Sequence, residues 1–144
     1  MTAPAEGTLR KIATFAAAFG IAVATYIAIS EAGGGSPACI AGGGGGCQTV
    51  AESAYSELAG INVAVIGIFG YVLLLAAAIL RGDAARITGF GLALVGFGFS
   101  IYLTYLELFV IDAICQWCVV SAVVMTALFA TNALRMVRYV GTPP

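Results

Sequence analysis

The chain has 144 residues, of which 61% are hydrophobic and only 9% are charged, with a mean hydropathy of +1.04 and a net charge of −1. Since a soluble domain carries about 25% charged residues, this composition excludes an ordinary water-soluble enzyme. The lack of a basic surplus argues against a nucleic-acid partner. The absence of histidine excludes Ser-His-Asp and Cys-His catalysis and every His-ligated metal site. Four cysteines remain as the candidates for chemistry.

The few charges delimit long apolar segments. Four uncharged runs are found, at 12–30, 58–80, 87–106 and 113–134. A helix of about 20 residues crosses the ~30 Å hydrocarbon core of a bilayer, so each run is about one membrane long. The predicted fold class is an all-α membrane protein, a bundle of four transmembrane helices that forms a single domain over 1–144. These helices are expected at about 10–30, 60–80, 87–108 and 113–135.

The basic residues predict the orientation in the membrane. They precede the first helix, separate the second from the third, and follow the fourth: Arg10, Lys11, Arg81, Arg86, Arg135 and Arg138. Four spans bring all of them to one face, which the positive-inside rule makes cytoplasmic. We therefore expect a multi-pass protein of the inner or plasma membrane with both termini in the cytoplasm. Cleavage of the first run as a signal peptide is not favoured, because its 19 residues exceed a normal signal h-region.

The segment 31–59 is predicted to be an outward-facing loop. It is rich in glycine and carries Cys39 and Cys47. Thr49 and Glu52 fit a capping box, and the apolar residues that follow recur at helical spacing. The pattern predicts a short amphipathic helix on the membrane surface that continues through Leu58 and stops at Gly60.

Two features of the predicted spans concern their packing. Gly96, Ser100 and Thr104 form a stripe of small residues on the third helix, which predicts a close helix contact. Tyr71 lies in the middle of the second helix, so its hydroxyl is expected to face the bundle interior or a pocket.

The predicted topology gathers the four cysteines at the outer face. Cys39 and Cys47 lie in the outward loop, while Cys115 and Cys118 form a Cys-x-x-Cys at the start of the fourth helix. The outer side of a bacterial inner membrane is oxidising, and a loop pair beside a Cys-x-x-Cys is typical of thiol–disulfide exchange. A helix N-terminus favours the reactive thiolate. Asp112 is the expected N-cap of that helix.

Three other roles for the cysteines stay open at this point. Two structural disulfides would stabilise a non-enzymatic membrane protein, although a disulfide within a helical Cys-x-x-Cys is strained. A zinc site is disfavoured because seven residues separate Cys39 from Cys47, against two to four in zinc ribbons. A cysteine-based metal carrier would need cysteines in mid-membrane or on the cytoplasmic side, where the predicted topology has none.

The chain resembles vitamin K epoxide reductase and its bacterial homologues over about 10–135. The resemblance is carried by Cys39-x7-Cys47, by Ser53 six residues later, and by the segment 102–118, which reads YLTYLELFVIDAICQWC. The DsbB family also has four helices, but there the Cys-x-x-Cys precedes the other pair.

The resemblance implies a membrane thiol–disulfide oxidoreductase with four helices around a quinone. Cys115 and Cys118 resemble the active-site pair, with Cys118 nearest the quinone. Cys39 and Cys47 resemble the shuttle pair, in which Cys47 exchanges with Cys115 and Cys39 faces the partner. The quinone pocket is expected to include Ser53, Asn62 and Tyr71, the last on its deep position.

The resemblance also implies the substrates and partners. The acceptor would be a membrane quinone, such as menaquinone, ubiquinone or a vitamin K-type quinone, and no metal is expected. Mammalian members have a tyrosine four residues after the second active-site cysteine, where this chain has Ala122, a departure that bears on reduction of the epoxide. Many bacterial members continue into a thioredoxin-like domain, whereas this sequence ends at Pro144. The electron donor is therefore expected to be a separate thioredoxin-fold (DsbA-like) protein that supports disulfide-bond formation, or else a domain of a longer protein of which this sequence is a part.

Overall fold

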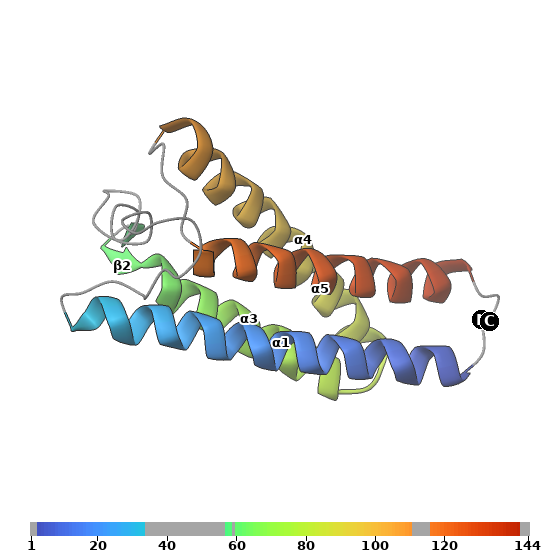
Figure 1. The fold of residues 1–144 in the computed structure, drawn as a ribbon. Coiled ribbons are helices and arrows are strands. Elements are labelled where there is room, and N and C mark those ends of the chain that lie inside the picture. Colours follow the sequence, from blue (N-terminus) through green and yellow to red (C-terminus); the bar gives the residue numbers. More distant parts are fainter. Residues whose placement is uncertain (1–2, 34–56, 59, 111–115, 142–144) are drawn as a thin grey trace.

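The computed structural model describes residues 3–33, 57–58, 60–110 and 116–141 and is dominated by helices (Figure 1). The long helices of this described part are α1 (Ala3–Ala32), α3 (Val63–Ile79), α4 (Asp83–Tyr105) and α5 (Gln116–Gly141). A five-residue π-helical turn, η2 (Leu106–Val110), continues α4. Two short strands, β1 (Glu57–Leu58) and β2 (Ile61–Asn62), pair antiparallel just before α3.

The predicted all-α membrane bundle is confirmed. Three segments of the described chain are long and apolar enough to cross a bilayer: Gly7–Ala32, Asp83–Val110 and Gln116–Gly141. The fourth, α3, is a shorter apolar helix of 17 residues. The first and last helices extend beyond their uncharged runs, since arginine and lysine are good helix formers and continue the helix into the charged end.

The predicted surface helix is wrong at its C-terminal end. Glu57 and Leu58 form a strand, in which Glu57 pairs with Asn62 and Leu58 with Ile61. Gly60 has a φ of 84°, a left-handed conformation that glycine adopts without strain, and the chain turns back there. Backbone pairing across this turn overrides the helical spacing of the side chains. The rest of the predicted helix, with Thr49 and Glu52, lies outside the described residues.

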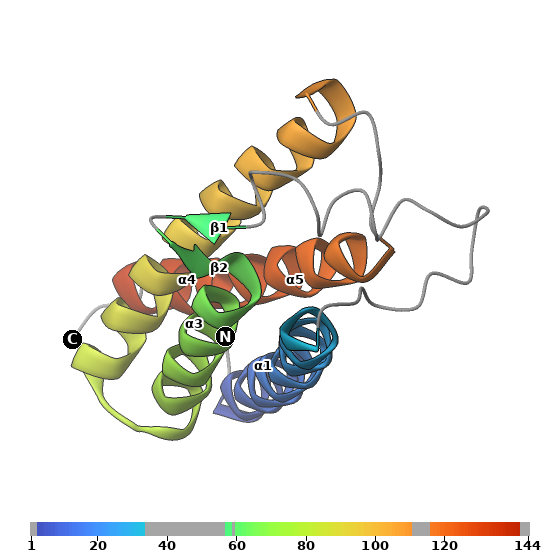
Figure 2. The same ribbon diagram turned by 90° about the vertical axis from the view of Figure 1, so that its left-hand side faces the viewer.

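The helices surround a common interior. Helix α1 packs against α3 and α5, and α4 packs against α5 and α3, so each helix has two neighbours. Figure 2 shows this arrangement from the end of the bundle that bears the strands. The N-terminal part of α1, the α3–α4 connection and the C-terminal part of α5 lie together at the opposite end.

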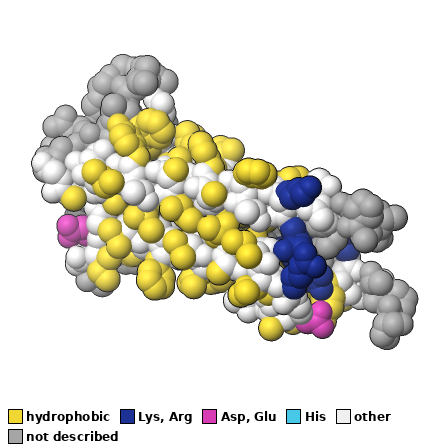
Figure 3. All heavy atoms as spheres, turned by 90° about the horizontal axis from the view of Figure 1, so that it is seen from below, with side chains coloured by type: hydrophobic (Ala, Val, Ile, Leu, Met, Phe, Trp, Pro, Cys, Tyr) yellow, Lys and Arg dark blue, Asp and Glu magenta, His cyan; other side chains and the backbone are white. Residues whose placement is uncertain are grey.

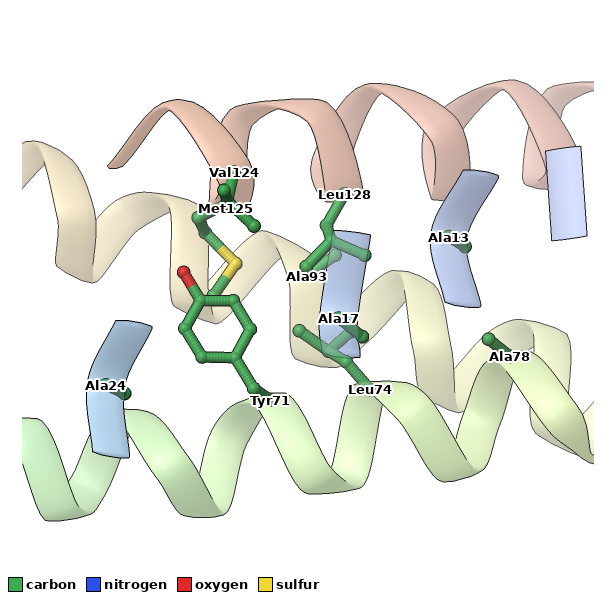
Figure 4. Close-up of a cluster of buried hydrophobic side chains, with 10 residues drawn as sticks. All are labelled: Ala13, Ala17, Ala24, Tyr71, Leu74, Ala78, Ala93, Val124, Met125 and Leu128. Carbon is green, nitrogen blue, oxygen red and sulfur yellow. The ribbon is translucent and has the colours of Figure 1, made fainter. Parts of the chain in front are cut away.

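The half of the bundle away from the strands is closely packed. Its core consists of small residues from three helices, with two leucines between them (Figure 4): Ala13, Ala17, Ala78, Ala93, Leu74 and Leu128. At Gly89, an added Cβ would lie 2.9 Å from Oδ1 of the buried Asn132 and 3.3 Å from Cβ of Ala77. The small side chains therefore allow the helix backbones to approach closely.

The same end of the bundle carries the basic residues. Figure 3 shows a broad hydrophobic face with lysine and arginine side chains gathered near one end of it. Arg10 donates from Nε to the carbonyl of Ala78 at 3.3 Å and from Nη2 to that of Ile79 at 3.1 Å. These bonds satisfy carbonyls at the C-terminus of α3, where a cation is favourable. The charge distribution agrees with the grouping that the sequence predicts.

Candidate active site

A cavity of about 370 Å³ opens between the helices at the end that bears the strands. Figure 1 shows why space remains there: α4 and η2 lean away from α5 toward this end. Most of the lining side chains are apolar and come from all the long helices. The polar side chains that line it are Glu31, Tyr71, Ser100, Thr104, Glu107, Cys118 and Ser121. The lining therefore combines an apolar wall with a small set of reactive or hydrogen-bonding groups.

Tyr71 and Met125 form the floor of the cavity, and both lie against glycines. Tyr71 is 1% exposed, and an added Cβ at Gly20 would lie 2.4 Å from its Cε1. Met125 fills the space at Gly96, where an added Cβ would lie 2.7 Å from the sulfur. Figure 4 shows the Tyr71 ring reaching from α3 toward Met125 on α5. The two glycines let large side chains close the bundle below the cavity.

The hydroxyl of Tyr71 faces the bundle interior, as its mid-helix position predicts. It donates to the backbone carbonyl of Ser121 at 2.9 Å and lies 2.8 Å from Oγ of the same serine. A buried phenol normally needs such a partner. Ser121 lies one helical turn after Cys118, so this polar pair stands directly below the cysteine.

Cys118 lies in the first turn of α5, is half-buried and lines the cavity. The start of α5 is held against α1 by the rings of Trp117 and Tyr26, whose centroids are 4.9 Å apart. Trp117 also packs against a small core made by Val23, Ile27 and Ala64. The packing of Trp117 against α1 and this core thus places the cysteine on the cavity wall.

The other sequence-predicted site residues on the outer loops lie outside the described residues. These are Cys39, Cys47, Ser53, Asp112 and Cys115. The predicted grouping of the four cysteines, the pairing among them and the cap of the fourth helix therefore stay predictions.

Asn62 and Glu31 form a polar pair at the mouth of the cavity. Asn62 is the N-cap of α3, where its Oδ1 accepts from the backbone N–H of Ala64 at 2.7 Å. Its Nδ2 donates to Oε2 of Glu31 at 2.5 Å. Of the two side chains, Glu31 is the one that lines the cavity. The asparagine expected in the pocket thus anchors a carboxyl group there.

The stripe of small residues on α4 serves two purposes. At Gly96 the predicted close contact is found, with Met125 of α5. The prediction of packing is wrong at Ser100 and Thr104, which line the cavity because α4 has diverged from α5 at this level. The Thr104 hydroxyl donates to the Ser100 carbonyl of its own helix at 2.8 Å.

Sequence reasoning missed the cavity role of Glu31 and Ser121. Glu31 is the first charged residue after the uncharged run 12–30, so the sequence places its carboxyl group at the outer end of the first helix. Ser121 follows Cys118 at i+3, a spacing that brings both to one face of a helix. Glu107 is 7% exposed and also lines the cavity.

The cavity has the properties of a small-molecule site. Its volume lies within the ~300–1,000 Å³ usual for such pockets, and an apolar wall with a few placed polar groups is their normal composition. An apolar ring with one or two polar oxygens would suit this lining, with Cys118 on one wall. In a comparison with known protein families, the sequence model described as "Vitamin K epoxide reductase family" matches residues 11–133 of this chain. This range includes every residue that lines the cavity.

Proposed function

The chain belongs to the vitamin K epoxide reductase family, and from this premise we propose that it is a disulfide:quinone oxidoreductase of the membrane. As a member of this family it is a membrane oxidoreductase built on a helical bundle. In the proposed reaction, a dithiol of the protein is oxidised to a disulfide while a membrane quinone is reduced to the quinol. The quinone is a substrate that accepts the electrons, and vitamin K-type quinones belong to the class that the cavity would take.

The observation that carries the proposal is the position of Cys118 on the wall of an apolar cavity. The cavity of about 370 Å³ has room for a quinone ring, and its lining is mostly hydrophobic. A thiol there lies beside any ring that enters, in mostly apolar surroundings. Holding the two reactants together in an apolar site is the main contribution that a protein makes to such a reaction.

We propose that electrons reach Cys118 through the other cysteines. A reduced thioredoxin-fold protein, as a separate chain, would reduce the Cys39–Cys47 disulfide, and Cys47 would then exchange with Cys115. Each exchange proceeds through a mixed disulfide and needs only a small difference in potential, since 30 mV corresponds to ~1.4 kcal/mol for two electrons. This path requires the cysteine loops on the outer face and both termini in the cytoplasm, which the basic residues at the opposite end support.

Three further residues are proposed to shape the quinone site within this single transmembrane domain. Tyr71 would close the cavity below the ring, since its side chain forms the floor. Asn62 would act at the mouth through the carboxyl group that it holds. Ser53 is carried over from the family resemblance.

The test is quinone reduction by purified protein with dithiothreitol as the electron donor. Cys118→Ala is expected to reduce turnover to the uncatalysed background, because the thiol next to the acceptor is lost. Val119→Ala is the matched control, since Val119 is the next residue on α5 and is 44% exposed on the outside of the bundle. It is expected to retain wild-type turnover. Unchanged turnover in Cys118→Ala would refute the proposal.

The same proteins separate the two rival functions. If the cysteines only form structural disulfides, wild-type protein shows no quinone-dependent turnover, and Cys118→Ala lowers the unfolding temperature. If the chain is a metal carrier, reduced wild-type protein binds a stoichiometric amount of metal and transports it into vesicles. Either result would contradict the proposed oxidoreductase.

A further inference from the structure

Reduction of a quinone needs two protons as well as two electrons, and the cavity offers few acids. Two carboxyl groups line it among the described residues, those of Glu31 and Glu107. Glu107 lies on the η2 turn, and Glu31 lies in the last turn of α1. The carboxyl group of Glu31 is held in place by the side chain of Asn62.

Asn62 fixes the Glu31 carboxyl group at the cavity mouth. Its amide accepts a bond from the backbone of α3 at 2.7 Å and donates one to Oε2 of Glu31 at 2.5 Å. The amide is therefore oriented by the helix N-terminus before it meets the carboxyl group. The bond engages Oε2 of a carboxyl group that lines the cavity.

No cation lines the cavity beside Glu31 among the described residues. Glu31 sits at the C-terminal end of α1, where the last carbonyls place partial negative charge. Glu57 of β1 pairs directly with Asn62, so a second carboxyl group lies close by. Toward the cavity it shares the lining with Glu107, Tyr71 and Cys118, none of which is a cation. A protonated carboxyl group donates a hydrogen bond, which is what a quinone carbonyl oxygen accepts.

We propose that Glu31, positioned by Asn62, is the acid that delivers a proton to the quinone oxygen. The inference rests on the proposed function and assigns it a catalytic residue. The reaction is balanced as follows: the Cys115 and Cys118 thiols lose two electrons and two protons and form a disulfide, and the quinone gains both pairs and becomes the quinol. Glu31 gives one proton to the quinone oxygen and is restored by a proton that the thiols release.

The experiment is a single-turnover reaction of prereduced protein with a short-chain quinone, followed by quinone absorbance over a range of pH. In wild-type protein, the rate constant should rise with pH as a thiolate forms and fall again as the Glu31 carboxyl group loses its proton. Glu31→Gln preserves the bond from Asn62 but carries no acid. It should be about 100- to 10,000-fold slower near the wild-type optimum, and the descending limb should disappear.

Asp83→Asn is the control, since it removes an exposed carboxyl group at the opposite end of the bundle, outside the cavity lining. It should keep the wild-type rate and both limbs. Asn62→Ala should slow the reaction but keep the descending limb, because the acid is still present though less well held. Quinone affinity, measured by quenching of the fluorescence of Trp117, the one tryptophan in the sequence, should change less than threefold in Glu31→Gln.

Two results would overturn the inference. The first is a wild-type rate in Glu31→Gln, and the second is a descending limb that survives in this variant. Failure of the proposed function looks different, because then wild-type protein itself would not reduce the quinone. A parallel loss of affinity and rate in Glu31→Gln, with both limbs kept, would show a binding role and would also contradict proton delivery.

Discussion

The two halves of the bundle use the same helices in opposite ways. In the half near the basic residues, alanines such as Ala13 and Ala93 are 0–1% exposed and the helices pack closely. In the half near the strands, α4 leans away from α5 and a cavity of about 370 Å³ remains. In the closed half, polar side chains serve the fold, as where Arg10 donates a hydrogen bond to a carbonyl at the C-terminus of α3. In the open half, Cys118 and Glu31 line the cavity.

The boundary between the halves lies at the level of Tyr71 and Met125, and the packing there explains where the cavity ends. Tyr71 fits against Gly20 and Met125 fits against Gly96, so each large side chain has a glycine opposite it. Below this level, Leu74 and Leu92 form the last part of the cavity lining, and small residues such as Ala17 and Ala93 then close the bundle. Above it, helix divergence leaves space that the side chains do not fill. The two contacts between a glycine and a large side chain thus mark where close packing ends and the cavity begins.

The largest expected effect comes from breaking that boundary with Gly20→Ala. The new Cβ would lie 2.4–2.7 Å from three atoms of the Tyr71 ring, which is enclosed and has little room to move. Overpacking of a close-packed interior costs about 3 kcal/mol at the upper end of its usual range. We expect a clearly lower unfolding temperature in detergent, together with weaker quinone binding because the floor shifts.

Two variants check that the ring contact is the cause. Gly91→Ala on α4 adds the same methyl group where nothing lies within 4 Å, and it should be neutral or slightly stabilising. Adding Tyr71→Leu to Gly20→Ala should recover part of the lost stability, because the clashing ring is gone. An equal loss in Gly91→Ala, or no recovery in the double variant, would contradict the boundary role.

The next comparison is one truncation in each half. Leu128→Ala removes a side chain that is 0% exposed in the closed half. Because lipid is as apolar as leucine, the loss is mainly that of packing, about 2 kcal/mol. Leu103→Ala, on the cavity wall, should cost less than about 1 kcal/mol because its neighbours already face a void. Thermal unfolding measures the difference in stability loss between the two variants. Quinone affinity should change only in Leu103→Ala.

The sequence predicted the bundle well because membrane helices depend on hydropathy, which is local. Uncharged runs of membrane length correspond to the helices found, and Tyr71 points inward as its depth implies. The prediction of a surface helix was wrong at Glu57 and Leu58, because the turn at Gly60 and backbone pairing place these residues in a strand. Helical spacing carries no information about such pairing.

The sequence predicted the cysteine of the site, but only some of the residues that surround it. Cys118 could be placed on the site from its motif, and it lines the cavity. The role of Glu31 depends on a bond across 31 residues of sequence to Asn62, which no local pattern contains. The cavity itself arises from the divergence of α4, so Ser100 and Thr104 appeared to be packing residues. Tertiary geometry, rather than residue type, separates a packed stripe from a cavity wall.

The variant with the smallest expected effect tests whether the Tyr71 hydroxyl only stabilises the fold or also contributes to quinone binding. Tyr71→Phe removes a hydroxyl that bonds the Ser121 carbonyl and lies 2.8 Å from its Oγ, and a lost hydrogen bond of this kind costs about 1 kcal/mol. Ser121→Ala should cost less, since the carbonyl acceptor remains. If the hydroxyl only supports the fold, both variants lower the unfolding temperature and leave quinone affinity unchanged. We expect affinity to fall several-fold in Tyr71→Phe, because the polar pair lies on the cavity side of the boundary directly below Cys118.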